Sequence, residues 1–228
     1  MIALNLPKEY LSHSQIECWK KSKKDYRKRY YEGRPMYITP ELEFGKLIGG
    51  QYEALHKDEP VDLTHPVIGQ IPRGTTPEYE LRCELRGVPV LGFIDSYNEE
   101  NRRIDELKTG KVPWTQARVD RHPQLKMYAA SIKHMHGSYD PYVYLHWLET
   151  ENYEDDECID GISVGTRRIR LTGRLETFRT TVMINDIIEY EKMVEQVARE
   201  ISEDYTMWQR LHPKVEEAEG VIDGINFT

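Results

Sequence analysis

Two carboxylates and a lysine near the middle of the chain carry the clearest chemical signal in the sequence. Asp95 ends the run Gly-Phe-Ile-Asp, and the later run Glu-Leu-Lys contains Glu106 and Lys108. The two runs are typical of neighbouring antiparallel strands, on which Asp95 and Glu106 can approach each other. Glu106 and Lys108 are two residues apart, so both side chains leave the same face of their strand. We therefore expect two carboxylates and one ammonium group to converge at one patch.

The chemistry of these groups favours a hard divalent cation. Adjacent carboxylates without a metal repel each other and raise each other's pKa, whereas Mg²⁺ takes oxygen ligands and keeps several waters. Lys108 would then be a point charge that orients or helps to deprotonate a metal-bound water, or that offsets charge on a phosphate. The alternative is a cross-strand cluster of surface ion pairs, which is common for so short a motif.

In order along the chain, five segments resemble motifs of the PD-(D/E)XK nuclease superfamily, in its RecB-like and phage-type exonuclease branch. The segments are LSHSQIECW, FGKLIGGQYEALH, GFID, ELKTGK and QLKMYA, within residues 10–135. The resemblance implies an α/β fold with a restriction-endonuclease-like core. In such a core a central mixed β-sheet is flanked by helices, and a divalent metal binds where two strands diverge.

The same resemblance implies a role for each residue of the patch. Asp95 and Glu106 would ligate the metal, together with the carbonyl of Leu107, and Lys108 would be the catalytic lysine. The implied metal is Mg²⁺, with Mn²⁺ as the other candidate.

A predicted helix from His122–Pro123 to His136 carries two further candidates. Proline is favoured in the first turn of a helix. Gln124 and Tyr128 are four residues apart, so they share one helix face. By resemblance, this pair lines the DNA side of the site.

The first motif departs from the family pattern. Many relatives carry a metal-ligating histidine where this chain has Gly49. Glu53 lies one turn later on the same predicted helix face, and it is our candidate for the missing ligand or water-holding group. His56 on that face is the second choice, although an ordinary solvent-facing histidine is the favoured interpretation of this residue.

The number and spacing of the cysteines limit which disulfide and metal-cluster arrangements the chain can form. Cys18, Cys83 and Cys158 are widely spaced and form no CxxC motif, which disfavours a disulfide scaffold and a zinc ribbon and fits a reducing compartment. Relatives with an iron–sulfur cluster use one early cysteine and three clustered near the C-terminus. Cys18 matches the first, but no later cluster supplies the four ligands. We therefore expect no iron–sulfur cluster.

The charge is unevenly distributed, with a basic segment near the N-terminus. Residues 1–34 hold nine Lys and Arg against four Asp and Glu, whereas residues 149–160 hold seven acids and no base. Aromatic residues among the cations offer stacking surfaces beside phosphate-binding groups, although a solvated helix face is the alternative. The predicted DNA contacts are Lys20, Lys23, Arg27, Arg29 and Tyr30.

Hydrophobic periodicity and turn residues predict helices over 12–32 and 41–57, and strands over 79–85, 88–97 and 103–109. The helix at 122–136 follows, then strands over 142–148 and 162–171 and a long closing helix. We expect one nuclease domain over 1–228. Its parts are a basic helix 12–32, a catalytic core 41–172, a long helix 173–210 and an acidic tail 213–228.

Composition excludes several classes of protein. The 228 residues are 39% hydrophobic and 31% charged, enough for a sizeable core in a soluble chain. The net charge of −8 argues against a protein coated in positive charge. No apolar run approaches the ~20 residues of a membrane span, and no signal peptide begins the chain. We expect a cytoplasmic protein without a membrane partner, in the host cytoplasm if it is phage-encoded.

The candidate metal site, together with the resemblance to PD-(D/E)XK nucleases, predicts a divalent-metal-dependent DNA nuclease, with an exonuclease favoured. The partner is DNA, as a single strand or a duplex end, and a DNA recombination or repair role fits. A homo-oligomer, or a recombination or CRISPR-type protein partner, is compatible with the same residues. The alternatives are a catalytically weakened module that holds DNA ends and a restriction-type endonuclease, which the absence of a separate recognition domain disfavours.

Overall fold

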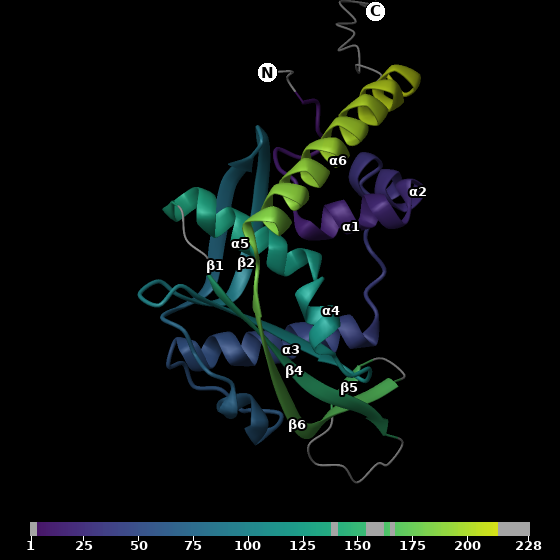
Figure 1. The fold of residues 1–228 in the computed structure, drawn as a ribbon. Helices are drawn as coiled ribbons and strands as arrows, with labels where there is room; N and C mark the ends of the chain where they lie inside the picture. Colours follow the sequence, from purple (N-terminus) through teal and green to yellow (C-terminus); the bar gives the residue numbers. More distant parts are fainter. Residues whose placement is uncertain (1–3, 138–140, 154–161, 165–166, 214–228) are drawn as a thin grey trace, which may run out of the picture.

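A computed structural model describes residues 4–137, 141–153, 162–164 and 167–213 (Figure 1). The helical elements are α1 (His13–Lys21), α2 (Lys23–Tyr26), η1 (Arg27–Tyr31), α3 (Pro40–His56), η2 (Pro66–Gln70), α4 (Gln116–Asp120), α5 (Pro123–His136) and α6 (Ile184–Leu211). The strands are β1 (Thr76–Leu85), β2 (Val88–Asn98), β3 (Arg103–Gly110), β4 (Tyr142–Tyr153), β5 (Ile162–Val164) and β6 (Arg167–Thr181).

The strands form one sheet in the order β1-β2-β3-β4-β6-β5. The first three strands are the antiparallel meander that the turn residues predict. The β3–β4 pair is parallel, because α4 and α5 carry the chain back across one face between them. The sheet is therefore mixed, and the predicted α/β class with helices flanking a central sheet is confirmed.

Two separate clusters of buried side chains hold helices on the two faces of the sheet. The larger joins the sheet to α1, α5 and α6, with Leu125, Trp147 and Val194 among its members. The smaller packs α3 and η2 against the strands through Phe44 and Ile48. The candidate site residues lie between these two layers.

The N-terminal helix predicted over 12–32 is broken into three pieces. Ser22 has an extended backbone, with φ −160° and ψ 102°, and its side chain accepts a hydrogen bond from the backbone N–H of Asp25. It therefore ends α1 and caps α2, as a serine readily does. The following turn is π-helical, since Glu32 N–H bonds to the carbonyl of Arg27.

The C-terminal helix begins later than predicted. Residues 173–181 belong to β6, which pairs antiparallel with β4, and α6 starts only at Ile184. The predicted strand over 162–171 is correspondingly divided into β5 and the start of β6. Helix α6 packs one apolar face into the core, because Ile187, Val194 and Ile201 are buried.

Parts of the acidic regions fall outside the described residues, namely 154–161 and 214–228, and so does Cys158. Within the described ranges, no helix is both long enough and apolar enough to cross a membrane.

Candidate active site

Strands β2 and β3 separate at the two predicted carboxylates. Their register pairs Ser96–Asn98 with Arg103–Asp105 and goes no further. Asp95 and Glu106 are the next residue on each strand beyond the last pair. Both carboxylates therefore lie at a fork in the sheet, where the two strands no longer bond to each other.

Four of the predicted residues form one hydrogen-bonded network on the α5 side of the fork. Lys108 Nζ donates to Glu106 and to Gln124 Oε1, the latter at 3.0 Å. Gln124 Nε2 donates to the Tyr128 hydroxyl, which lies 3.0 Å from Glu106 Oε2 and 2.6 Å from the carbonyl oxygen of Phe93. Glu106 is only 2% exposed, so these donors satisfy a carboxylate that is withdrawn from water. The sharing of faces predicted for Glu106 with Lys108, and for Gln124 with Tyr128, is confirmed.

Asp95 completes the acidic pair from the neighbouring strand. Its Oδ2 accepts a hydrogen bond from the backbone N–H of Leu107 at 2.6 Å. Burial, and then the charge of Glu106, hold the pKa of Asp95 well above its usual range, although Lys108 and the Leu107 N–H oppose the shift. The fork is therefore short of positive charge, a deficit that a bound cation would relieve.

Lys108 is the nearest compensating charge. Burial lowers the pKa of its ammonium group, but Glu106 and Asp95 outweigh burial and the net shift is upward. In this arrangement Lys108 is a protonated donor and not a base.

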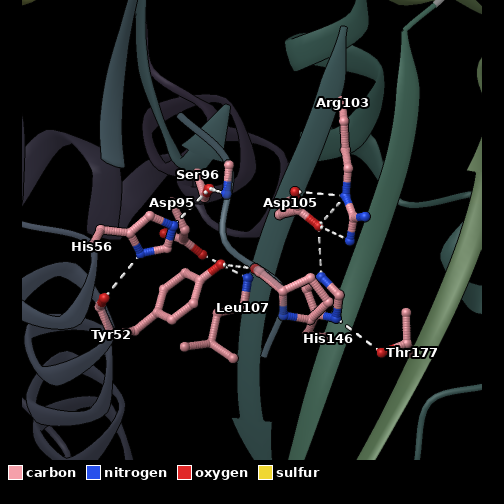
Figure 2. A network of polar contacts seen from close by, with 11 residues as sticks. Tyr52, His56, Asp95, Ser96, Arg103, Asp105, Leu107, His146 and Thr177 are labelled. Carbon is pink, nitrogen blue, oxygen red and sulfur yellow. Dashed lines mark hydrogen bonds and ion pairs between the residues drawn. The ribbon is translucent and has the colours of Figure 1, made fainter. Parts of the chain in front are cut away.

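A buried polar network fixes β3 from the opposite face of the sheet (Figure 2). Asp105 is fully buried, and Arg103 Nε donates to both of its oxygens at 2.8 Å. His146 on β4 lies 2.7 Å from Asp105 Oδ1 and bonds to Thr177 on β6 through its other nitrogen. These contacts tie the strand that carries Glu106 to β4 and, through His146, to β6.

His56, the second choice for the missing ligand, is already occupied by protein partners. Its Nδ1 lies 3.0 Å from the carbonyl oxygen of Tyr52, and its Nε2 lies 3.0 Å from Ser96 Oγ (Figure 2). The hydroxyl of Ser96 in turn accepts a hydrogen bond from the backbone N–H of Gly74. Both ring nitrogens are therefore used to join α3 to β2.

Helix α3 leaves room beside the fork. A Cβ at Gly45 would lie 3.2 Å from Thr109 on β3, whereas a Cβ at Gly49, one turn later, would meet no atom within 4 Å. Glu53 follows one more turn along and makes an ion pair with Lys57. The position of Gly49 therefore faces open space, which suits a bound group or a larger side chain.

Glu78 is an acidic residue that the sequence did not single out. The register of β1 and β2 sets it opposite Asp95, and its backbone has φ +46°, which is uncommon for glutamate. Desolvation of the carboxyl by its surroundings, followed by the charges of Glu53 and Glu106, raises the pKa of Glu78, although the residue as a whole is exposed. Among the described residues, no three His, Cys, Asp or Glu side chains are arranged to hold a metal ion by themselves. Oxygen ligands from the backbone and from water would thus have to complete a metal site here.

The predicted DNA contacts separate into two groups. Lys23 and Arg27 bind carboxylates of α6, at 3.1 Å from Glu200 and 2.9 Å from Asp204, and Lys20 pairs with neighbouring Glu17. Several aromatic residues of this segment pack inward: Trp19 and Tyr26 are buried, and Tyr31 stacks near Tyr205 and Trp208. Arg29 and Tyr30 instead line a pocket that also includes Gln124 and Tyr128.

This pocket, which we call the site pocket, has a volume of about 530 Å³. Beside it lie two histidines that sequence reasoning missed, His13 and His122, with ring centroids 5.9 Å apart. The Nδ1 atom of each is buried, and no hydrogen-bond partner for it exists among the described residues. Burial lowers the pKa of each imidazole to about 4, and the charge of Lys108 acts on both. No local pattern marks them, because they come from the starts of two helices far apart in sequence.

No family model matches the chain, and no curated protein matches it. Among solved structures, the fold is similar to a crystal structure from Eubacterium rectale named "Putative exonuclease", with a TM-score of 0.53 and 13% identity. That match covers 87% of this chain and 82% of the other. A second structure, SSO0001, matches with a TM-score of 0.42 and 10% identity, over 89% and 77% of the two chains. At these identities the first similarity establishes a shared fold, so the chain has the α/β fold of a protein named as an exonuclease.

Proposed function

We propose that this chain is a divalent-metal-dependent DNA nuclease of the RecB-like branch of the PD-(D/E)XK superfamily. The observation that carries the proposal is the fork between β2 and β3. Asp95, Glu106 and Lys108 lie together at this fork. Gln124 accepts a hydrogen bond from Lys108, and Tyr128 is hydrogen-bonded to Glu106. An exonuclease is favoured because the Eubacterium rectale protein of similar fold carries that name.

The donor set fits Mg²⁺ or Mn²⁺. Asp95, Glu106 and the carbonyl of Leu107 would hold the metal through oxygen, and Glu53 is our candidate for a further ligand or water-holding group. Two carboxylates and one carbonyl leave several coordination positions to water, as Mg²⁺ prefers. Such a cation supplies a Lewis acid for the phosphoryl oxygen and a bound water of lowered pKa.

The remaining residues would bind the phosphodiester and hold the groups around it in place. The Lys108 ammonium can donate to a non-bridging phosphate oxygen, and Gln124 holds it in place through its Oε1 atom. Tyr128 orients Glu106 by hydrogen bonding to Oε2. His13 and His122, neutral at pH 7, offer further polar atoms beside Lys108.

An endonuclease, an exonuclease and an inactive binder are separated by one digest. End-labelled linear DNA and covalently closed circular DNA are incubated with the protein in Mg²⁺ and in EDTA. We expect nucleotides from linear DNA, intact circles, and no cleavage in EDTA. Glu106→Gln should abolish cleavage, whereas the matched variant Glu80→Gln, at an exposed position on β1, should cleave as the wild type does. Cleavage in EDTA, or by Glu106→Gln, would refute the proposal.

A second candidate, a weakened module that holds DNA ends, is favoured by one observation. Gly49 supplies no ligand to the fork, and no three metal-binding side chains group among the described residues. This candidate predicts binding of linear DNA without cleavage in either Mg²⁺ or Mn²⁺.

A further inference from the structure

A second pocket adjoins the site pocket on the far side of Arg29. Its volume is about 780 Å³, and it is bounded by α1, by α2 and η1, and by the segment 34–37. The two pockets share His13, Ser14 and Arg29 as lining residues, so they meet along the start of α1. In Figure 1 the segment after η1 runs as an open connection down to α3. The two pockets therefore extend from Gln124 and Tyr128, which bond to Lys108 and Glu106 of the fork, to the outer surface of this connection.

The second pocket combines cations with exposed apolar side chains. Its basic residues are Lys21, Lys28, Arg29 and Arg34, against two acids, Glu17 and Asp25. Tyr37 is 82% exposed and Met36 is 40% exposed, although both are large and apolar. A patch of this kind with a net positive charge favours an anionic ligand that also presents flat apolar surfaces.

Arg29 lies where the two pockets meet and has no carboxylate partner among the residues described. Its Nη1 lies 3.0 Å from the sulfur of Met36, and its guanidinium lies 5.0 Å from the centre of the Tyr30 ring. Arg27, two residues earlier, is held by Asp204. Of these two arginines, Arg29 is therefore the one free to bind a phosphate.

We propose that the second pocket binds the unpaired strand of a single-stranded DNA whose scissile phosphate lies at the fork, an inference that rests on the proposed nuclease function. Cations that follow a backbone, next to exposed aromatic rings, are the composition of single-strand grooves, because unstacked bases can stack on the rings. A duplex keeps its base faces inside the stack and presents only phosphates and groove edges. The exposed ring of Tyr37 would thus have no partner on a duplex. The substrate class is single-stranded DNA, or a duplex end that is already unpaired.

The test measures DNA binding by the Glu106→Gln variant, so that cleavage does not consume the probe. Fluorescence anisotropy follows an oligothymidylate of about 12 nucleotides, within the usual site size, and a blunt duplex of equal length. Tyr37→Ala should weaken single-strand affinity by about 5- to 100-fold, the range expected for one base stack. Tyr142→Ala, at an exposed tyrosine outside both pockets, is the matched control and should have no effect. Arg29→Gln should reduce the salt slope by about 0.7, whereas Arg82→Gln should not.

The outcomes separate this inference from the proposed function. Equal or tighter binding of the blunt duplex, or equal effects of Tyr37→Ala and Tyr142→Ala, would overturn the inference. Mg²⁺-dependent cleavage of duplex in preference to single strands would overturn it and leave the nuclease standing. Tyr37-dependent binding of single strands by a protein that cleaves no DNA would support the groove and overturn the nuclease.

Discussion

Replacing the half-buried histidines His13 and His122 with glutamine should make the protein more resistant to acid. Burial lowers the pKa of His13 and of His122 from 6.5 to about 4. The unfolded chain therefore binds more protons than the folded chain between these two values. The free energy of unfolding must fall as the pH drops through this window. Glutamine keeps a neutral amide donor and acceptor but takes up no proton, so it removes this loss.

The magnitude follows from the two pKa values. Going from pH 7 to pH 4.5, a histidine whose pKa falls from 6.5 to about 4 on folding costs about 2 kcal/mol of stability. The pair would cost about 4 kcal/mol if the two sites titrated independently. Because the ring centroids lie 5.9 Å apart, protonation of one ring disfavours protonation of the other, so the contributions are not strictly additive. The charged groups that act on the pair are Glu17, Lys20, Lys108 and Arg118.

The assay is urea denaturation of the wild type, both single variants and the double variant at pH 7 and pH 4.5. His212→Gln, at an exposed histidine after α6, is the matched control and should lose as much stability as the wild type. The raised pKa of Asp95 acts in the opposite direction but is common to all variants, so it cancels in the differences. If the double variant loses as much stability as the wild type, the two imidazoles are not held neutral by burial and the reasoning fails.

Three further changes test the fork. Glu78→Gln should raise the Mg²⁺ concentration needed for half-maximal cleavage, whereas Glu80→Gln should not; equal effects would place Glu78 outside the site. Gly49→His should fold without loss of stability, because no atom lies within 4 Å of its Cβ, and should lower the Mn²⁺ concentration needed for cleavage; an unfolded variant would contradict the open space. Asp105→Ala should cost about 3 kcal/mol in urea denaturation, because it breaks a buried ion pair, and a loss below about 1 kcal/mol would mean that the pair does not hold β3.

The parts of the site that follow from local periodicity were predictable. The alternation of a strand places Glu106 with Lys108, and the helical repeat places Gln124 with Tyr128; both pairs are joined in one network. The meander of β1 to β3 was likewise marked by its turn residues. Each of these conclusions needs only residues a few positions apart.

Features that depend on distant residues or on backbone irregularity were not predictable. Nothing in the sequence around Ser22 distinguishes it from an ordinary helix residue. Only the structure shows that its side chain caps α2. The end of β6 is rich in polar residues, so no hydrophobic alternation marks it as a strand, and only its pairing with β4 does. The basic segment predicted to contact DNA is another case in which distant residues could not be predicted. The carboxylates that engage Lys23 and Arg27 lie on α6 and leave no trace in the local sequence.

Those same contacts with α6 constrain when the walls of the two pockets can form. α1 and η1 line both pockets, and α2 lines the second pocket. Ion pairs from Lys23 of α2 to Glu200, and from Arg27 of η1 to Asp204, fasten this segment to the last helix. A ribosome synthesises α1 first and α6 last, so a nascent chain carries the Asp95, Glu106 and Lys108 triad long before it can fasten the wall. Ribosome-bound chains that end before Ile184 would thus contain Asp95, Glu106 and Lys108 before the walls of the two pockets are complete. The order of synthesis would then delay completion of the pocket walls until the last helix has emerged.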